Sequence, residues 1–470
     1  FWNARLAETI DNMSGNTYSD NTNNFLQLGD PGGGGAQVVA TDYTWRPQTP
    51  DGLPIVVGNL NIAVSNSGIL RIPAGTTIPF VANGSIFVGD TSGVAGSAGT
   101  IIAEGTSANP IVFRPLNPNQ PWGSIGVRYT QDVSNAIPPS PRLRLVHCII
   151  EGASIGLDVF GNTRDFLTVA NCTIRRCGVG IATSGVSFPT IDGCRIENCD
   201  TALKVGTVAS RPRNIARLPT IRNCTITNNR LALSLGPTGI GGDGFPYEDL
   251  SRWDNANNTF TDNEQNIALI DGVYLGHGDY VWRDTIMGLP VVVSQLYVGT
   301  RLSIPAGTTV RTVPSDRHGR FQVVSPGVLI AQGTADNPIR FTCTDPNRQW
   351  SGLTVMNGGT AQLEYCIIER ALTAIHPFTA DSMGFSGVVT VRNCTITDSG
   401  AGIYDFRDPT TYLGRPSSLT VENTTFRNLG TGIVASPRFD AITGCRFENL
   451  QVAIRLRPST GGNTFAADDL

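Results

Sequence analysis

A short motif recurs nine times along this chain, and this recurrence limits the possible folds more than any other feature. Each copy has an anchor residue, Cys in seven copies, followed by Ile or Phe two positions later and by Ile or Leu nine positions later. The anchors are Cys148, Cys172, Cys194, Cys224, Asn258, Cys366, Cys394, Thr424 and Cys445. A unit this short cannot bury its apolar face alone, so the copies must stack and share one core.

The residue pattern inside each copy predicts short strands. Apolar and polar residues alternate over runs rich in Ile, Val and Thr, as in Thr173-Ile174 and Thr390-Val391. Most anchors follow a residue type that tolerates a left-handed backbone, which predicts a corner. These residues are Asn171, Gly193, Asn223, Asn257, Asn393, Asn423 and Gly444. We therefore predict an all-β fold, a parallel β-helix (β-solenoid) whose coils rise by about 4.8 Å.

A longer duplication divides the chain. The segment YTWRPQTPDGLPIVV from Tyr43 returns as YVWRDTIMGLPVVV from Tyr280, and IIAEGTSANPIVF from Ile101 returns as LIAQGTADNPIRF from Leu329. The sequence thus predicts an N-terminal extension over residues 1–42 and two solenoid lobes over residues 43–275 and 276–470. Each lobe is large for one domain, but a solenoid grows by adding coils.

The order of these segments resembles that of the right-handed parallel β-helix repeat proteins secreted by bacteria, which are related in fold to pectate lyases. The resemblance covers nearly everything after Asp42, and the box AEGTSANPIVF is its most specific part. It implies an exported, elongated solenoid at an extracellular or cell-surface location. It does not imply any one activity.

Composition excludes several other classes of function. The net charge of -4 gives no basic surface for nucleic acid, and no apolar run approaches the roughly 20 residues of a membrane span. Four His residues and the absence of a Cys-x-x-Cys motif argue against a structural zinc site, so we expect neither a metal nor another cofactor.

The cysteines are interpreted mainly as core residues. Because Thr424 and Asn258 replace Cys at the anchor, the anchor is predicted to fill a small space. Cys177 and Cys199 differ, since each lies five residues after an anchor on adjacent coils. Stacked coils bring such Cα atoms to about 5 Å, which is within disulfide range, so this pair can form a bond.

Evidence for catalysis is weak. His277 lies in a Gly-His-Gly motif that resembles one of polygalacturonases, but the partner motifs of that family are missing, and a turn residue is the better interpretation. We assign no catalytic residue. A carbohydrate-active enzyme of the pectate-lyase-like fold remains the first alternative, and paired carboxylates about 5 to 10 Å apart in a groove would support it.

Insertions enter the coils after the second aliphatic residue and predict loops along one side of the solenoid. Binding sites are frequent on loops carried by a rigid scaffold. We take as a candidate binding face for a polysaccharide or another partner Arg211, Arg213, Tyr247, Trp253, Tyr404 and Tyr412. A monomeric adhesin that binds glycans through this face is the second alternative. The simpler interpretation, which we slightly favour, is that the aromatic residues pin the loops to the solenoid.

The two ends suggest self-association. Trp2, Leu6, Ile10 and Met13 would share one face of a short helix, and a Gly-rich stretch after them reads as a tether. Phe465 occupies the first apolar position of a further coil. An uncapped coil is a template for stacking, and head-to-tail contacts produce a filament. The sequence therefore favours a non-catalytic extracellular structural protein that forms a homopolymer.

Overall fold

The chain forms two compact units built almost entirely of strands. The computed structural model describes residues 10, 12–29, 37–38, 42–62, 68–88, 99–129, 142–161, 167–184, 189–206, 219–236, 257–276, 278–317, 319–378, 387–405, 418–435 and 441–456. Unit 1 comprises the described residues up to Ile267 together with Met287–Leu289, and unit 2 comprises the others. The lobe boundary between residues 275 and 276 concerns the sequence duplication and stays a prediction.

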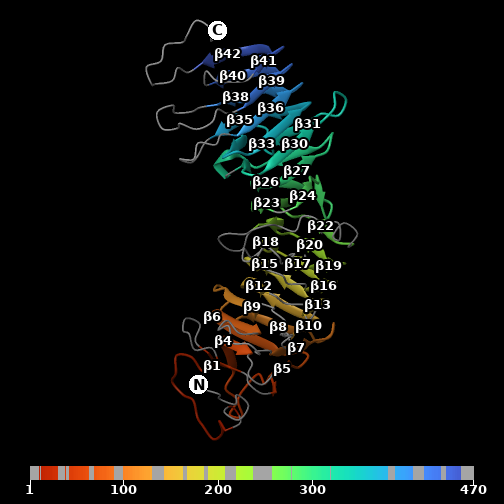
Figure 1. Cartoon of the computed structure of the whole chain (residues 1–470). Helices are drawn as coiled ribbons and strands as arrows, with labels where there is room; N and C mark the ends of the chain where they lie inside the picture. Colours follow the sequence, from red (N-terminus) through yellow and green to blue (C-terminus); the bar gives the residue numbers. More distant parts are fainter. Residues whose placement is uncertain are drawn as a thin grey trace. The chain divides into compact units, whose positions relative to one another are not determined.

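Unit 1 repeats three strands per coil, and each strand pairs in parallel with its equivalents on neighbouring coils (Figure 1). The first series is β3 (Tyr43–Thr44), β5 (Ile69–Ile72), β7 (Thr100–Glu104), β10 (Arg142–Val146), β13 (Leu167–Ala170), β16 (Thr190–Asp192) and β19 (Thr220–Arg222). The second is β8 (Ile111–Pro115), β11 (Cys148–Glu151), β14 (Thr173–Arg175), β17 (Arg195–Glu197), β20 (Thr225–Thr227) and β22 (Thr259–Thr261). The third is β1 (Leu26–Leu28), β4 (Ile55–Ile62), β6 (Thr77–Val88), β9 (Trp122–Tyr129), β12 (Ala153–Gly161), β15 (Val179–Ser184), β18 (Thr201–Val205) and β21 (Leu231–Leu235), with β2 (Gln37–Val38) beside β4.

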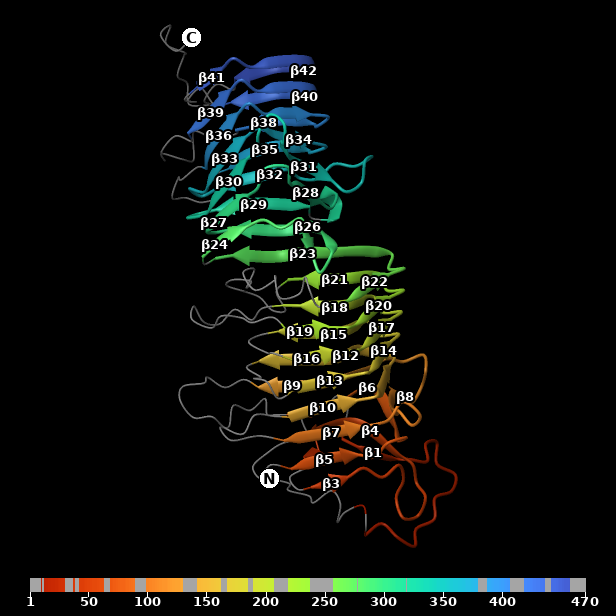
Figure 2. The same ribbon diagram turned by 90° about the vertical axis from the view of Figure 1, so that its right-hand side faces the viewer.

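Unit 2 has the same organisation, and Figure 2 shows β30, β33, β36 and β39 stacked in chain order. Its first series is β24 (Asp279–Val281), β27 (Arg301–Ile304), β30 (Val328–Gln332), β33 (Thr360–Glu364), β36 (Val388–Arg392), β39 (Leu419–Glu422) and β41 (Ala441–Thr443). The second is β25 (Thr285–Ile286), β28 (Thr309–Thr312), β31 (Ile339–Cys343), β34 (Cys366–Glu369) and β37 (Thr395–Thr397). The third is β23 (Gln265–Leu275), β26 (Leu289–Val298), β29 (Arg320–Val324), β32 (Leu353–Met356), β35 (Thr373–Phe378) and β38 (Ala401–Tyr404), while β40 (Thr425–Ala435) and β42 (Arg446–Leu456) run through both series.

The predicted apolar ladders fill the interior of each unit. Ile150 pairs with Ile174, Ile174 with Ile196, and Ile196 with Ile226, so the same position of successive coils lies in register. All four side chains are fully buried. The fold is a right-handed parallel β-helix, and the predicted fold class is confirmed.

Each of the nine coils that carry the motif turns at two corners with a left-handed backbone. The predicted corner before the anchor is confirmed, for example at Asn171 (φ 53°) and Gly193 (φ 62°). A second corner, which we did not predict, lies four residues after every anchor. Its residues are Gly152, Arg176, Asn198, Asn228, Asp262, Arg370, Asp398, Asn428 and Asn449. Four of the nine are Asn, and this recurrence is the signal in the sequence that points to the second corner.

The anchor side chains form hydrogen bonds between coils, so they do more than fill space. The N–H of Cys224 donates to Oδ1 of Asn258 on the next coil (3.0 Å), and Nδ2 of Asn258 donates to the carbonyl of Ile221 (2.9 Å). The N–H of Cys394 likewise donates to Oγ1 of Thr424 (3.4 Å). Cys, Asn and Thr interchange here because each offers a donor and an acceptor close to the backbone.

Buried Asn229 has the same role at the second corner. It accepts a hydrogen bond from the N–H of Cys199 (2.9 Å) and donates to the carbonyls of Ile196 (3.1 Å) and Thr227 (3.0 Å). Ser399 stands at the equivalent place in unit 2, where it accepts from the N–H of Ala371 (3.0 Å). These side chains satisfy backbone groups that would otherwise be buried without a partner.

The described part of the N-terminal extension packs on the first coils of unit 1, whereas most of the predicted plug and the Gly-rich tether lie outside the described residues. Leu26 pairs with Ile55 as β1 adds to β4, and buried Ile10 is only 1% exposed. The N–H groups of Gly15 and Asn16 donate to the carboxylate of Asp51 (2.7 and 3.2 Å). The described part of the extension therefore belongs to unit 1, because it completes the edge of the first long strand.

A charge placed in the Ile ladder tests the inward orientation of this column. We expect Ile226→Asp to destabilise unit 1 by more than about 4 kcal/mol, because it buries a carboxylate without a partner. Thr225→Asp, at the adjacent outward position of β20, is the matched control and should leave folding intact. Circular dichroism and thermal unfolding measure both variants, and a fully folded Ile226→Asp protein would contradict the assigned orientation.

Removal of a corner side chain tests its hydrogen-bonding role. Asn229→Ala leaves the N–H of Cys199 without its acceptor, so we expect a loss of about 1 to 3 kcal/mol in the free energy of unfolding. Asn229→Ser should recover part of that loss, because Ser399 forms equivalent bonds in unit 2. Equal losses for the two variants in urea denaturation would show that volume, and not hydrogen bonding, matters at this position.

Candidate functional site

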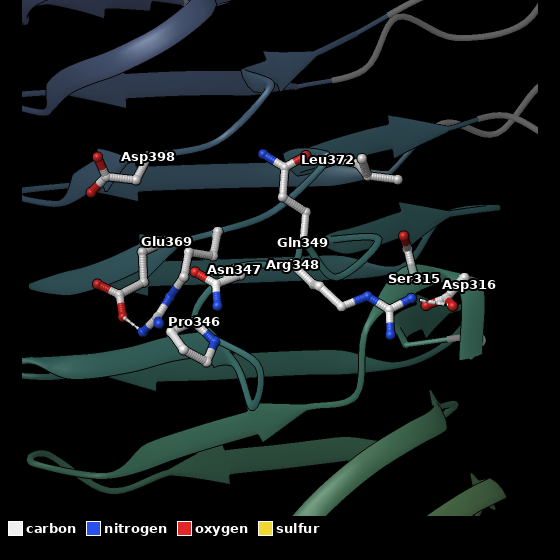
Figure 3. Close-up of a pocket in the computed structure, with 10 residues that line it drawn as sticks. Ser315, Asp316, Pro346, Asn347, Arg348, Gln349, Glu369, Leu372 and Asp398 are labelled. Carbon is white, nitrogen blue, oxygen red and sulfur yellow. Dashed lines mark hydrogen bonds and ion pairs between the residues drawn. The ribbon is translucent and has the colours of Figure 1, made fainter.

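An open groove of about 690 Å³ lies on the outer surface of unit 2, beside the second corner. It is formed by loop and corner residues from successive coils, shown in Figure 3. The lining residues are Ser315, Asp316, Pro346, Asn347, Arg348, Gln349, Glu369, Arg370, Leu372 and Asp398. None of these was among the predicted site residues, because they come from segments far apart in the sequence.

One wall of the groove is a short 3-10 helix, η2 (Ser315–Arg317), that unit 1 does not match. The residues Phe80 and Thr312 occupy equivalent places, as do Ile86 and Phe321. In unit 1, Ile86 follows Phe80 by six positions. In unit 2, Phe321 follows Thr312 by nine positions, so unit 2 has three additional residues here. This insertion carries Asp316, which forms an ion pair with Arg348 across the groove (Figure 3).

Glu369 lies at the end of β34, and both oxygens of its carboxylate have partners within the protein. Oε1 accepts hydrogen bonds from Thr342 (2.8 Å) and Arg370 (2.6 Å), and Oε2 forms an ion pair with Arg340. Burial alone would raise the pKa of Glu369, but hydrogen bonds from Arg370 and Thr342 and the positive charge of Arg340 outweigh it and hold that pKa below its ordinary value. A general acid needs the opposite shift.

Unit 1 contains a counterpart of this ion-pair cluster. Glu151 occupies the position equivalent to Glu369 and accepts hydrogen bonds from Arg175 (2.9 Å) and Arg176 (2.7 Å). The indole N–H groups of the buried Trp122 and Trp350 donate to the backbone carbonyls of Glu151 (2.8 Å) and Glu369 (3.0 Å). The cluster is therefore part of the duplicated framework.

Asp398, on the next coil, is also held by hydrogen bonds. Asn428 donates to its Oδ1 (2.9 Å) and the hydroxyl of Thr397 to its Oδ2 (2.9 Å). The groove thus presents carboxylates that already have partners within the protein, together with amide and hydroxyl groups. This arrangement suits a ligand that both donates and accepts hydrogen bonds.

Most of the predicted binding face lies outside the described residues. Arg211, Arg213, Tyr247, Trp253 and Tyr412 all fall there, as does His277. Tyr404 is described, half-buried at the end of β38, and its ring lies edge-on to His376 with 5.7 Å between ring centroids. Burial lowers the pKa of His376, against the opposing charge of Asp405.

Cys177 and Cys199 lie at equivalent corner positions of successive coils, as predicted, but both are free thiols. Each Sγ turns back toward a carbonyl two residues earlier, that of Arg175 (3.3 Å) for Cys177 and that of Glu197 (3.4 Å) for Cys199. Hydrogen bonding to Cys177 and burial raise the pKa of the Cys199 thiol. The structure therefore has two buried thiols where the sequence allowed a disulfide.

The last described coil of unit 2 leaves its interior ladder open. In β40, Phe426 and Ile433 are fully buried, whereas Ile454, the partner of Ile433 in β42, is 41% exposed and Leu456 is 39% exposed. In the described part of the chain, β42 pairs only with β40. Of the predicted assembly segment, Ile10 and Met13 lie in unit 1, and the residues outside the described part are Trp2, Leu6 and Phe465.

The Glu369 cluster predicts a dependence of stability on pH. Because the folded-state pKa lies below the ordinary 4.5, the cluster stabilises unit 2 above that pH, and the contribution is lost as the pH falls through the folded-state pKa. We expect Glu369→Gln to cost about 1 to 3 kcal/mol at pH 7 and much less at pH 3. In thermal unfolding, Glu422→Gln, which removes the more exposed ion pair with Arg392, should cost less than about 1 kcal/mol. A Glu369→Gln loss that does not change with pH would exclude this role.

Comparison with known proteins identifies the architecture only. In the described part of the chain, no helix has the length and apolarity needed to cross a membrane, and no group of three or more His, Cys, Asp and Glu side chains could hold a metal ion. No curated protein gives a significant match to the chain. No solved structure gives one either. Residues 129–284 match the family model described as a right handed beta helix region.

Proposed function

We propose that this chain is an extracellular, non-catalytic structural protein whose copies associate end to end through the last described coil. The observation that carries the proposal is the exposure of Ile454 and Leu456, which continue a ladder that is buried in every preceding coil of unit 2. The eleven-residue strand β42 pairs with β40 along one edge, and its opposite edge is the proposed place for a further strand. An edge of this kind is a template for a further strand.

A second copy of the chain fits this edge better than an unrelated partner. Coils stack in this fold by parallel pairing of like side chains, so the surface best matched to β42 is an outer coil of the same kind. In the described residues of unit 1, β1 pairs only with β4, and its other edge is the proposed place of contact for the second copy. Contact between two different ends is heterologous and generates an open polymer.

The described groove supports a non-catalytic role. Hydrolysis by paired carboxylates needs one of them protonated near neutral pH, and the pKa of Glu369 is shifted in the opposite direction. The carboxylates of Asp316 and Asp398 each contact a basic or amide group of the protein. The proposed extracellular location is consistent with the low content of charged residues, 15%, and with the resemblance to exported solenoids.

Substitutions in the last coil test the proposed assembly. We expect the full chain to form fibres or larger species as its concentration rises, and Ile454→Lys combined with Leu456→Lys to remain monomeric, because two charges prevent apolar stacking. Arg455→Ala changes the residue between them and is the matched control, with association unchanged. Light scattering after size-exclusion chromatography and electron microscopy provide the measurements.

Two results would contradict the proposal. The first is a full chain that stays monomeric at all concentrations, and the second is a double Lys variant that associates like the full chain. A variant that lacks residues 457–470 provides an additional test. Increased association of this variant would show that the removed segment competes for the same edge of β42. Depolymerisation of a polysaccharide by the full chain would favour the enzyme alternative.

A further inference from the structure

We propose that the groove of unit 2 binds an uncharged, hydroxyl-rich ligand, namely a neutral saccharide chain. This inference does not depend on the proposed assembly, because the groove uses corner and loop residues of β31, β34 and β37 and not the edge of β42. Its volume of about 690 Å³ lies within the range of sites that bind small organic ligands.

The groove contains polar side chains that no protein group engages. Asn347 and Gln349 lie on the same loop, and within the described residues neither side-chain amide has a hydrogen bond. Both residues line the groove, and Figure 3 shows the Gln349 side chain directed toward Leu372 and Asn347 lying beside Pro346. A carboxamide can donate and accept at once, which matches the paired donor and acceptor character of sugar hydroxyls.

The loop that carries these amides is fixed from both sides. The N–H of Asn347 donates to Oδ1 of Asp345 (2.9 Å), and the carbonyl of Gln349 accepts from the N–H of Ser315 (2.8 Å). Buried Trp350 follows immediately and anchors the end of the loop. A ligand would therefore meet a preorganised backbone, which lowers the entropic cost of binding.

An apolar surface lies in the same groove. Leu372 is 49% exposed, one of the few large apolar side chains in the described residues with such exposure. A single exposed leucine needs no explanation by itself. Together with two free amides it forms a surface with one apolar patch and convergent polar groups, which suits a pyranose ring with an apolar face and a rim of hydroxyls.

The charges of the groove argue against an ionic ligand. Arg348 pairs with Asp316, and Arg370 pairs with Glu369, so both guanidinium groups already have an anionic partner. The third carboxylate, that of Asp398, makes the lining slightly negative overall. A phosphate or uronate would therefore lack a free cation, and a neutral chain avoids this penalty.

Unit 1 supplies a matched comparison. Its equivalent loop contains Asn119 in place of Asn347 and Pro121 in place of Gln349, and the N–H of Asn119 forms the same turn bond to Asn117 (3.1 Å). The wall formed by Ser315–Arg317 has no counterpart there. Asn119→Ala therefore removes a similar side chain from a similar turn without changing the proposed site.

Binding to defined oligosaccharides tests the inference with the full chain. An array of neutral α- and β-linked hexasaccharides, with a galacturonate hexamer as the charged probe, first identifies a ligand. Isothermal titration calorimetry then measures its Kd. We expect the double variant Asn347→Ala, Gln349→Ala to weaken binding at least about tenfold, because two ligand hydrogen bonds are lost. Leu372→Ala should weaken it further, and Asn119→Ala should leave it unchanged.

Three outcomes would overturn the inference. They are the absence of binding to every neutral hexasaccharide, tighter binding of the galacturonate hexamer than of any neutral one, and equal losses for Asn119→Ala and for the groove variants. Circular dichroism of each variant separates a loss of binding from a loss of folding. The assembly experiments report on β42 alone, so either proposal can fail without the other.

Discussion

The structure depends on one constraint, which is that the backbone of each motif-bearing coil must turn sharply at two corners without leaving buried N–H and carbonyl groups unpaired. A left-handed residue at each corner makes the turn but removes its neighbours from the regular strand pairing. The side chain that follows the corner replaces the lost bonds, as Asn258 does for Cys224 and Asn229 for Cys199. These bonds add to the parallel strand pairing that keeps the ladder of apolar residues in register from coil to coil.

The same constraint leaves the outer surface free to vary. Once the corners set the register, loops can lengthen at the rim without disturbing the buried columns. The additional residues around Asp316 in unit 2 show this, since β28 and β31 still pair in register, with Thr312 opposite Cys343. A short insertion thus converts a corner into a groove while the core of the unit is unchanged. Function in such a solenoid is therefore added at the rim, residue by residue.

The sequence predicts what repeats, and it does not predict what occurs once. The columns of Ile226 and its equivalents and the corner at Asn171 could be predicted because a period of 21 or more residues carries them. The second corner was missed because Arg176 and Arg370 interrupt its Asn pattern, although their backbones are left-handed as well. The hydrogen-bonding role of the anchors was missed because Cys is usually interpreted as a small apolar residue.

The groove could not be predicted, for a different reason. Asp316 and Arg348 belong to different coils and no repeat relates them, so only the folded register brings them together. The pairing of Leu26 with Ile55 is similar, since a three-residue strand in a polar segment has no periodicity to recognise. Local sequence patterns identify interior positions well, whereas contacts between unique rim residues require the stacking of coils to be known.

Stacking relates the two proposals to each other. Coil-to-coil pairing is the interaction that stabilises each unit, and in the proposed assembly the edge of β42 would offer the same interaction to a second copy. A substitution in the inner columns would therefore impair folding and association together, whereas Ile454 and Leu456 affect association first. If copies do add end to end, each brings its own groove, so weak saccharide contacts act at a high effective concentration. An open groove of low intrinsic affinity is then sufficient, because avidity grows with the number of copies.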